Sequence, residues 1–266
     1  MGYRQHLVRS ILAIRADGGL LLPDGSRIQV EPILVGRNAP KLAAMAAEHY
    51  ITEFTTDLDS ALSDDGVQIY FDAQATSERK KAILKAIAVG KHIYTEKPLS
   101  QSVGEALELV GAAESAEVTN GVVHDKIYLP GLVKLKRLVD DGIFGRILSV
   151  RGEFCYWVFE GDDGPGQRPS WNYRADDGGG MVLDMFAHWN YVLEVLFGRV
   201  DAVTAKAVTH ITRRWDEQGQ PYEATADDAA YAIFELGGGV IAQINSSWAV
   251  RVNRDDVGDT HAFPVI

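Results

Sequence analysis

Cysteine and long apolar runs are both scarce in this chain of 266 residues. Its single cysteine is Cys155, so no disulfide can form within the chain, and we expect a cytoplasmic protein in a reducing environment. No apolar run approaches the roughly 20 residues that a membrane-spanning helix needs, and the first residues lack the basic and then apolar pattern of a secretion signal. We therefore expect no membrane partner.

Positive charge is scarce as well. The chain has 26 lysines and arginines against 37 aspartates and glutamates, which gives a formal net charge of −11. This charge repels nucleic acid, so we expect no nucleic-acid partner. An anionic cofactor would have to be held by local groups, such as backbone N–H groups, helix N-termini and a few arginines. Apolar residues make up 46% of the sequence, enough for one large domain or two ordinary ones.

The first half of the chain alternates between helical and extended patterns. Its predicted strands are short and apolar, as in a parallel sheet that helices cover on both faces. We therefore expect residues 1–123 to form an α/β domain with a Rossmann-like, doubly wound parallel sheet. The predicted strands are 32–35, 67–71, 92–95 and 118–123, and the predicted helices are 2–16, 76–90, 102–116 and one that Asn38 caps.

The second half has a different pattern, with longer strands and fewer helices. We expect residues 124–266 to form an α+β domain with a mostly antiparallel sheet, because a glycine hairpin at 237–239 joins two of its strands. The predicted helices are 130–141 and 181–196, the predicted strands are 147–159, 200–211, 227–236 and 240–250, and a loop rich in glycine, proline and aspartate spans 161–180.

The tripeptide Glu96-Lys97-Pro98 directly follows the predicted strand 92–95. A lysine at the carboxyl end of a buried parallel strand lies where such folds bind ligands. Its ammonium group can hydrogen-bond a substrate hydroxyl, or move a proton if its pKa is lowered. The tripeptide alone fits an ordinary strand end with a proline stop just as well, so both interpretations stay open at this point.

A second motif combines three glycines, Gly178-Gly179-Gly180, with Asp184 and His188. Residues four apart project from one face of a helix, and the glycines let the chain approach a ligand closely. A carboxylate beside an imidazole can orient the ring and raise its basicity, which suits a general base acting on an alcohol. The alternative is an ordinary pair on the helix surface.

Together, the two motifs resemble those of the glucose–fructose oxidoreductase, inositol dehydrogenase and rhizopine-catabolism family, abbreviated Gfo/Idh/MocA. Its members pair a Rossmann domain carrying Glu-Lys-Pro with an α/β domain carrying Gly-Gly-(Gly)-x-x-x-Asp-x-x-x-His. The resemblance covers most of the chain. It implies that residues 1–123 bind a nicotinamide nucleotide, and that residues 124–266 bind a carbohydrate substrate and form a homodimer or homotetramer.

The resemblance also implies catalytic roles in hydride transfer between the cofactor and a sugar or polyol carbon. Lys97 would hold and polarise the reacting oxygen, and His188 would take or give the hydroxyl proton. Asp184 would orient His188 or contact the substrate directly. We expect no metal site, because the histidines and acidic residues near these positions lack the close spacing of a ligand set.

Further substrate contacts are expected near the glycine-rich loop and at the start of the second domain. Aromatic faces stack on sugar rings, and arginines hydrogen-bond hydroxyl groups. For each of these residues, packing in the core or simple solvation is the alternative. The expected substrate contacts are Lys126, Trp171, Tyr173 and Arg174, together with Asp184 and His188.

The same resemblance implies a binding site for NADP or NAD. An acidic residue after the strand 32–35 would bind the ribose hydroxyls of NAD, whereas Arg37 suits the extra phosphate of NADP, so NADP is slightly favoured. A surface arginine near a helix start is the alternative. The other expected cofactor contacts are Gly2, Tyr3, Gly36, Asn38, Gln74, Thr76, Glu96 and Lys97.

The sequence departs from the family pattern at its ends. Family members begin with a strand and a Gly-x-Gly-x-x-Gly turn, whereas this sequence starts at Met1-Gly2-Tyr3. We expect the first strand of the Rossmann sheet to be missing, so that its neighbours expose backbone edges, and the C-terminus to be short as well. Three functions therefore compete: an NAD(P)-dependent sugar or polyol dehydrogenase or reductase, an NAD-dependent glycoside hydrolase of the same family, and a non-catalytic or truncated binding relative.

Overall fold

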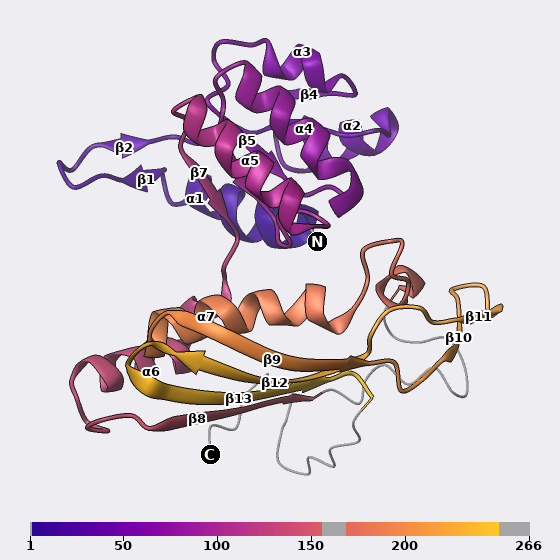
Figure 1. Cartoon of the computed structure of the whole chain (residues 1–266). Coiled ribbons are helices and arrows are strands. Elements are labelled where there is room, and N and C mark those ends of the chain that lie inside the picture. The colour runs from indigo at the N-terminus through magenta and orange to yellow at the C-terminus, as the bar shows by residue number, and fades with distance from the viewer. Residues whose placement is uncertain (1, 156–168, 250–266) are drawn as a thin grey trace. The chain divides into compact units, whose positions relative to one another are not determined.

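The chain folds into two compact units, Met1–Val123 and His124–Ile266. The structure is a computed structural model (Figure 1), and it describes residues 2–155 and 169–249. Each unit has its own sheet structure and its own buried clusters, so each is described by itself below.

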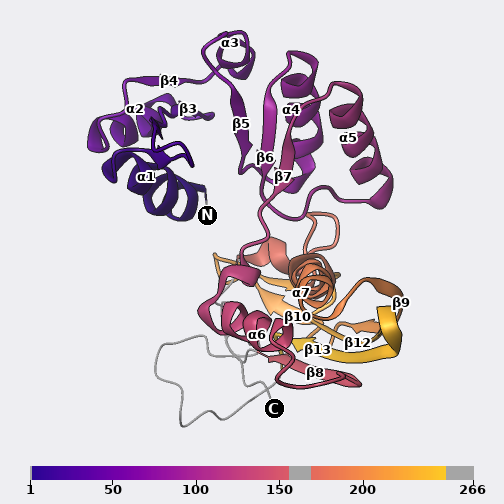
Figure 2. The ribbon, with the colours of Figure 1, turned by 90° about the vertical axis from the view of Figure 1, so that its left-hand side faces the viewer.

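The first unit carries two parallel sheets flanked by helices. The strand pairs β3–β4, β5–β6 and β6–β7 are all parallel, which confirms the predicted Rossmann-like α/β class. Figure 2 shows α4 and α5 running side by side along β5, β6 and β7. The strands are β3 (Ile33–Val35), β4 (Glu53–Thr55), β5 (Ile69–Asp72), β6 (His92–Thr95) and β7 (Asn120–Val122), and the helices are α2 (Ala39–Glu48), α3 (Leu58–Leu62), α4 (Thr76–Ala88) and α5 (Val103–Ser115).

Side-chain caps fix where two of these helices begin. The Asn38 side chain accepts a hydrogen bond from the Lys41 N–H at 2.9 Å, and Ser102 accepts one from the Glu105 N–H at 3.3 Å. Each cap satisfies a backbone N–H that the first turn of a helix leaves without a partner. The predicted helix starts at Asn38 and Ser102 are therefore confirmed.

The predicted helix 2–16 forms as two segments, the wide π-helix η1 (Gly2–Ile11) and the α-helix α1 (Leu12–Ala16). Leu7 of η1 is buried in a small cluster with Leu34 and Leu42, so this helix packs against β3 and α2. A short antiparallel hairpin follows, made of β1 (Leu20–Leu21) and β2 (Arg27–Ile28).

The second unit is built on one four-stranded mixed sheet with the order β8-β13-β12-β9. β12 is antiparallel to both neighbours and β8 is parallel to β13, which confirms the predicted α+β class with a mostly antiparallel sheet. Beyond Cys155, the predicted strand 147–159 lies outside the described residues. The strands are β8 (Ser149–Cys155), β9 (Val200–Val208), β12 (Ala229–Leu236) and β13 (Val240–Ser247), and η5 (Gly237–Gly239) forms the predicted hairpin turn.

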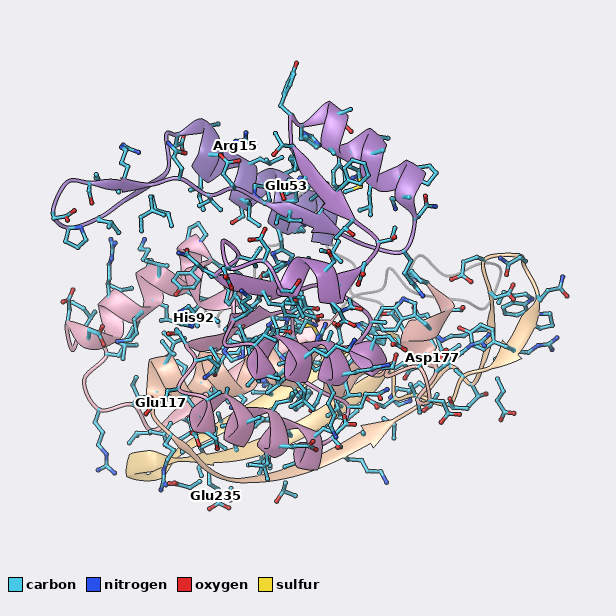
Figure 3. The ribbon with its side chains drawn as sticks, turned by 90° about the horizontal axis from the view of Figure 1, so that it is seen from above. Arg15, Glu53, His92, Glu117, Asp177 and Glu235 are labelled. Carbon is cyan, nitrogen blue, oxygen red and sulfur yellow. The ribbon has the colours of Figure 1, made fainter. Side chains whose placement is uncertain are left out.

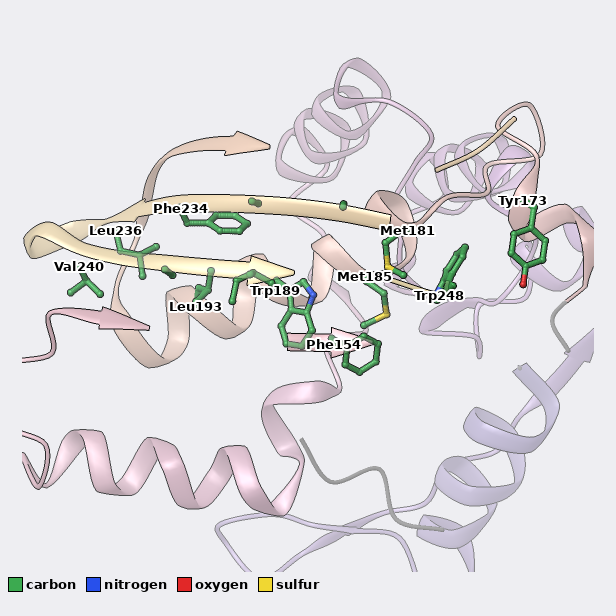
Figure 4. Packing of buried hydrophobic residues seen from close by; sticks show 14 of the residues in the cluster. Phe154, Tyr173, Met181, Met185, Trp189, Leu193, Phe234, Leu236, Val240 and Trp248 are labelled. Carbon is green, nitrogen blue, oxygen red and sulfur yellow. The ribbon is translucent and has the colours of Figure 1, made fainter. Parts of the chain in front are cut away.

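Helices cover one face of this sheet. Along β12, buried and exposed residues alternate, because successive side chains of a strand point to opposite faces. The buried face packs against Met185 of the π-helix η4 (Val182–Phe186) and against Trp189 and Leu193 of the α-helix α7 (Ala187–Phe197), as Figure 4 shows. The helix α6 (Pro130–Asp140) lies against α7 in turn.

Charged side chains are exposed on both units. Glu53 and Glu117 are exposed in the first unit, and Asp177 and Glu235 in the second (Figure 3). This distribution is usual for a water-facing surface. Among the described residues, no helix combines the length and the apolar character that crossing a membrane would require.

A buried ion pair holds the chain where it leaves β9. The Asp228 carboxylate accepts hydrogen bonds from the His210 and Ile211 N–H groups at 2.8 and 2.9 Å, and Arg214 donates to it at 3.2 Å. Burial makes these contacts necessary, because a buried charge without partners costs several kcal/mol. The pair directs the chain into an antiparallel hairpin, β10 (Arg213–Trp215) and β11 (Pro221–Glu223), which the sequence analysis did not predict.

Candidate active site

Most of the predicted cofactor contacts of the first unit lie directly after its parallel strands, which belong to two sheets. Gly36, Arg37 and Asn38 follow β3, Gln74 lies between β5 and the start of α4 at Thr76, and Glu96 and Lys97 follow β6. Carboxyl ends of parallel strands lie at one edge of a sheet, and ligands bind there in open α/β folds. Arg37 is exposed, as a contact to a phosphate group requires.

Gly2 and Tyr3 lie at the start of η1. A Cβ atom at Gly2 would come within 2.9 Å of the Ala73 Cβ, so the glycine lets this helix start beside the loop that follows β5. The Tyr3 hydroxyl lies 2.7 Å from His49 Nε2 and donates to Glu48 at 3.1 Å. Its hydroxyl is therefore engaged with α2 and the residue that follows this helix.

Glu96 is held on both of its carboxylate oxygens. Oε1 contacts Nε2 of His6, and Oε2 accepts a hydrogen bond from the Lys97 N–H at 3.0 Å. Burial raises the pKa of the Glu96 carboxyl, but the hydrogen bond and charge of His6, together with Lys97, lower it by more. The pKa of Glu96 therefore lies below its ordinary value, and the carboxylate is ionised at neutral pH.

Arg79 joins the two loops that carry Gln74 and Lys97. It is fully buried on α4, and its Nε donates to Asp72 Oδ2 at 2.6 Å. Its other nitrogens donate to the backbone carbonyls of Gln74, at 3.0 Å, and of Pro98. The sequence analysis assigned no role to this arginine, because its partners belong to two segments, the end of β5 and the loop after β6, that only the fold brings together.

In the second unit, the His188 ring contacts Tyr191 on its own helix and lies near Asp125, in the segment that begins this unit. The ring is 5% exposed, and its Nδ1 lies 2.5 Å from the Tyr191 hydroxyl oxygen. That oxygen also accepts a hydrogen bond from the Lys126 N–H at 3.1 Å, and Asp125 Oδ1 lies 3.9 Å from Nδ1. The Tyr191 hydroxyl thus links the ring to the segment that begins the second unit.

Sequence reasoning did not single out Tyr191, whose hydroxyl contacts the candidate catalytic residue His188. It lies three residues after His188 on α7, a spacing that places two side chains side by side on a helix, so the signal was present. Burial raises the pKa of Tyr191, which keeps its hydroxyl protonated at neutral pH. The His124 ring stacks on Tyr191 with centroids 4.1 Å apart, and burial lowers the pKa of His124.

The other predicted residues of the second unit fall into two groups. The Trp171 side chain is 49% exposed, whereas Tyr173 is 2% exposed within the core cluster, under the guanidinium of Arg214 at 3.8 Å. Arg174 lies over the ring of Tyr222 at 4.5 Å. Trp171 and Tyr173 belong to one short 3-10 helix, η3 (Ser170–Tyr173), which therefore presents one aromatic ring to solvent and buries the other.

Lys126 and Asp184 are both partly exposed. Lys126 begins the 3-10 helix η2 (Lys126–Tyr128), and Asp184 lies in η4, one turn before His188. Lys126 and His188 also line an open cavity of about 330 Å³ whose apolar wall side chains come mainly from α6 and α7, while β8 contributes mostly polar residues. Within the described ranges, 2–155 and 169–249, no cluster of three or more histidines, cysteines and acidic residues is placed to hold a metal ion.

The glycine turn before η4 is tightly packed on two sides. A Cβ at Gly179 would lie 2.5 Å from the carbonyl oxygen of Trp171, and one at Gly180 would lie 2.7 Å from Asp227 Oδ1. The Asp227 side chain accepts a hydrogen bond from the Val182 N–H at 2.8 Å, as an N-cap residue does. The glycines therefore allow η3 and Asp227 to fix the start of the helix that carries Asp184 and His188.

We predict that Gly180→Ala destabilises the protein more than Gly238→Ala does. Both glycines have positive φ angles, +126° and +78°, but a Cβ at Gly238 would meet no atom within 4 Å. The added methyl group at Gly180 also displaces Asp227, so the extra cost in unfolding free energy is about 1–3 kcal/mol. Urea unfolding of the two variants measures the difference, and equal losses would contradict the assigned role of Asp227.

Comparison with known proteins matches both halves of the chain to one family. Residues 24–124 match the family model described as "Oxidoreductase family, NAD-binding Rossmann fold". Residues 132–261 match the one described as "GFO/IDH/MocA C-terminal domain". The two matches follow each other along the chain in the order that the sequence motifs imply.

Individual relatives agree with this match. The chain is 62% identical to a D-xylose dehydrogenase of Paenarthrobacter nicotinovorans, over 97% of this chain and 67% of the relative. It is 26% identical to a 1,5-anhydro-D-fructose reductase of Ensifer adhaerens, over 90% of this chain and 65% of the relative. The chain thus spans about two thirds of the length of these curated relatives.

Solved structures share the fold. An NAD binding oxidoreductase from Klebsiella pneumoniae aligns with a TM-score of 0.80 at 24% identity, covering 92% of this chain and 64% of that chain. A levoglucosan dehydrogenase in complex with NADH and L-sorbose aligns with a TM-score of 0.78 at 21% identity, covering 91% of this chain and 63% of that chain. With both domain matches and a relative at 62% identity, the chain belongs to the GFO/IDH/MocA family of oxidoreductases, whose first domain is an NAD-binding Rossmann fold.

Proposed function

We propose that this chain is an NAD(P)-dependent dehydrogenase or reductase that acts on a CH–OH group of a sugar or polyol. Its 62% identity to a D-xylose dehydrogenase over 97% of the chain makes D-xylose the first substrate to test. The observation that carries the proposal is the His188 ring, buried and held at Nδ1 by the Tyr191 hydroxyl. A fixed imidazole of this kind suits proton transfer to or from an alcohol.

His188 is the proposed general base when the alcohol is oxidised. With a proton on Nδ1, the ring donates to the Tyr191 oxygen, which also accepts from the Lys126 N–H. Nε2 then carries a lone pair that can accept the hydroxyl proton of the substrate. In the reverse direction the protonated ring returns this proton to the carbonyl oxygen. Asp184 orients His188 or contacts the substrate in this proposal.

Lys97 is the proposed partner of the reacting oxygen. Glu96 fixes its backbone by accepting the Lys97 N–H at 3.0 Å, directly after β6. From there the ammonium group holds and polarises the substrate oxygen, which stabilises the charge that develops as the hydroxyl proton leaves. Lys126 and Arg174 are further candidates for hydroxyl contacts, and the exposed ring of Trp171 is the candidate for stacking on the sugar.

The residues after β3, β5 and β6 fit a dinucleotide. At Gly36 a Cβ would lie 3.3 Å from a methyl group of Leu42, and α2 and α4 begin directly after these segments, so the N-termini of both helices are candidates for contacts with the phosphates. When bound there, the nicotinamide accepts or supplies the hydride. The proposed contacts are Gly2, Tyr3, Gly36, Arg37, Asn38, Gln74, Thr76, Glu96 and Lys97.

We predict that Lys97→Ala and His188→Ala each lower kcat with D-xylose by at least about 100-fold, because each removes a group that acts on the reacting oxygen. Reduction of NAD or NADP, followed by absorbance, measures the rate. Lys85→Ala, at a partly exposed position, and His210→Ala, at an exposed position, are matched controls that keep the activity. Wild-type rates in both single variants would contradict the assigned roles.

Two further measurements, product analysis with a glycoside and titration with the nucleotides, separate the competing functions. Sugar release from a glycoside without net reduction of added cofactor would identify an NAD-dependent glycoside hydrolase instead. A folded protein that binds neither nucleotide would be a non-catalytic relative.

For the cofactor, we propose NADP, with Arg37 contacting the phosphate on its ribose. Titration of NADPH and NADH, followed by nicotinamide fluorescence, is expected to show tighter binding of NADPH. Arg37→Ala is expected to weaken NADPH binding about 10- to 100-fold and to leave NADH binding nearly unchanged, because only NADPH carries the extra phosphate. Arg146→Ala, at an exposed position of the second unit, is the control. Tighter binding of NADH by the wild-type protein would overturn the choice of NADP.

We further propose a homodimer or homotetramer that forms through the open face of the second unit's sheet. Ile233 of β12 and Ile241 of β13 are exposed there, beside Tyr231, and neighbouring apolar side chains on a sheet favour burial against a partner. Light scattering is expected to give the mass of two or four chains, and Ile233→Lys to give a monomer. Ile143→Lys, at an exposed position outside the sheet, is the control. A monomeric wild-type protein would contradict this assembly.

We propose a cytoplasmic location, because a chain whose single cysteine is Cys155 forms no internal disulfide and suits a reducing environment.

A further inference from the structure

His6 contacts the tripeptide Glu96-Lys97-Pro98 from a distant part of the chain. It lies in η1, 90 residues before Glu96, and its Nε2 contacts Glu96 Oε1. The two side chains are 16% and 11% exposed, so little water competes with their contact. The sequence analysis gave His6 no function, and the proton transfer described above does not use it.

The surroundings of His6 fix its ring. The ring packs against Phe71 of β5, with centroids 4.8 Å apart. Phe71 in turn lies against Tyr94 of β6, with centroids 5.6 Å apart. The imidazole is therefore held over the ends of the two strands that precede Gln74 and Lys97, with one nitrogen directed at Glu96.

Glu96 transmits this contact to Lys97. One carboxylate oxygen contacts His6, and the other accepts the Lys97 N–H at 3.0 Å. A carboxylate is a planar group with two acceptor oxygens, so fixing one oxygen also fixes the direction from which the other meets the backbone. A charge-assisted hydrogen bond of this kind is about twice as strong as a neutral one.

We propose that His6 is a positioning residue for Lys97. By holding Glu96, it fixes the backbone from which the Lys97 side chain extends toward the reacting oxygen. The effect of His6 on catalysis rests on the proposed dehydrogenase function, whereas the effect of His6 on the Lys97 backbone does not. His6 itself touches neither the substrate nor the reacting atoms in this scheme.

The test compares His6→Leu, which keeps an apolar contact with Phe71 but loses the hydrogen bond, with His6→Gln, whose amide can still donate to Glu96. Hydrogen exchange at the Lys97 amide, measured by NMR, is the readout that needs no activity. His6→Leu is expected to speed this exchange about tenfold, while the Ile93 amide, bonded to the Thr119 carbonyl at 2.9 Å, keeps its rate. His6→Gln is expected to restore slow exchange at Lys97.

Kinetics with D-xylose give the second readout. His6→Leu is expected to lower kcat about 10-fold with KM changed less than about 3-fold, and His6→Gln to recover most of kcat. The double variant His6→Leu/Glu96→Gln is expected to be no slower than Glu96→Gln alone, because both changes break one connection. His92→Leu is the matched control, since the exposed His92 begins β6, at the opposite end of this strand from Lys97, and its Nδ1 accepts a hydrogen bond from the Thr119 N–H at 3.1 Å.

The outcomes separate the two proposals. An unchanged exchange rate at Lys97 in His6→Leu would overturn the positioning role, whatever the enzyme activity. Equal acceleration at Lys97 and Ile93 would also overturn it, because it would show general loosening of the unit. A wild-type protein without activity on any sugar would refute the proposed function alone, and the exchange experiment would still decide the role of His6.

Discussion

The buried ion pair between Asp72 and Arg79 is the contact on which the first half of the site depends. Asp72 ends β5, and Arg79 reaches from α4 to this carboxylate and to the carbonyl groups of Gln74 and Pro98. A guanidinium group has five donors in a rigid plane, so a single side chain can hold several acceptors in fixed positions. The loops after β5 and β6 are thereby held together at the edge where a nucleotide is expected to bind.

In the second unit, close packing at a glycine turn fixes the segment that carries the candidate residues, where the first unit uses a buried ion pair. Its site helix starts at a turn where Gly179 meets the backbone of η3 and Gly180 meets Asp227. No larger residue fits these contacts without movement, and Asp227 also caps the helix through the Val182 N–H. The position of His188 is therefore set mainly at the start of its helix, and the Tyr191 hydroxyl then sets the rotation of its ring.

Sequence patterns predicted the helices, strands and turns that depend on interactions between residues close together in the chain. The caps at Asn38 and Ser102, the apolar strands and the glycine hairpin were all visible in the sequence, because each depends on neighbours within a few residues. The strand β4 and the hairpin β10–β11 were not, since they are short and carry no apolar run. The contacts of Arg79, His6 and Tyr191 were also missed as functional features, because a buried polar contact depends on which distant segments the fold brings together. The two motifs supplied the candidate site residues Lys97, Asp184 and His188, whereas the groups that contact Glu96 and His188 became visible only in the structure.

The link from His188 through Tyr191 to the Lys126 backbone has a consequence for protein engineering. From the sequence, the glycine turn and the helix after it form one continuous segment that could be grafted onto another protein. The ring orientation, however, also depends on a backbone N–H that lies 62 residues earlier in the chain, where the second unit begins. A graft that carried only residues 178–191 would bring the imidazole without the donor that fixes its hydroxyl neighbour, so the segment around Lys126 has to be transplanted with it.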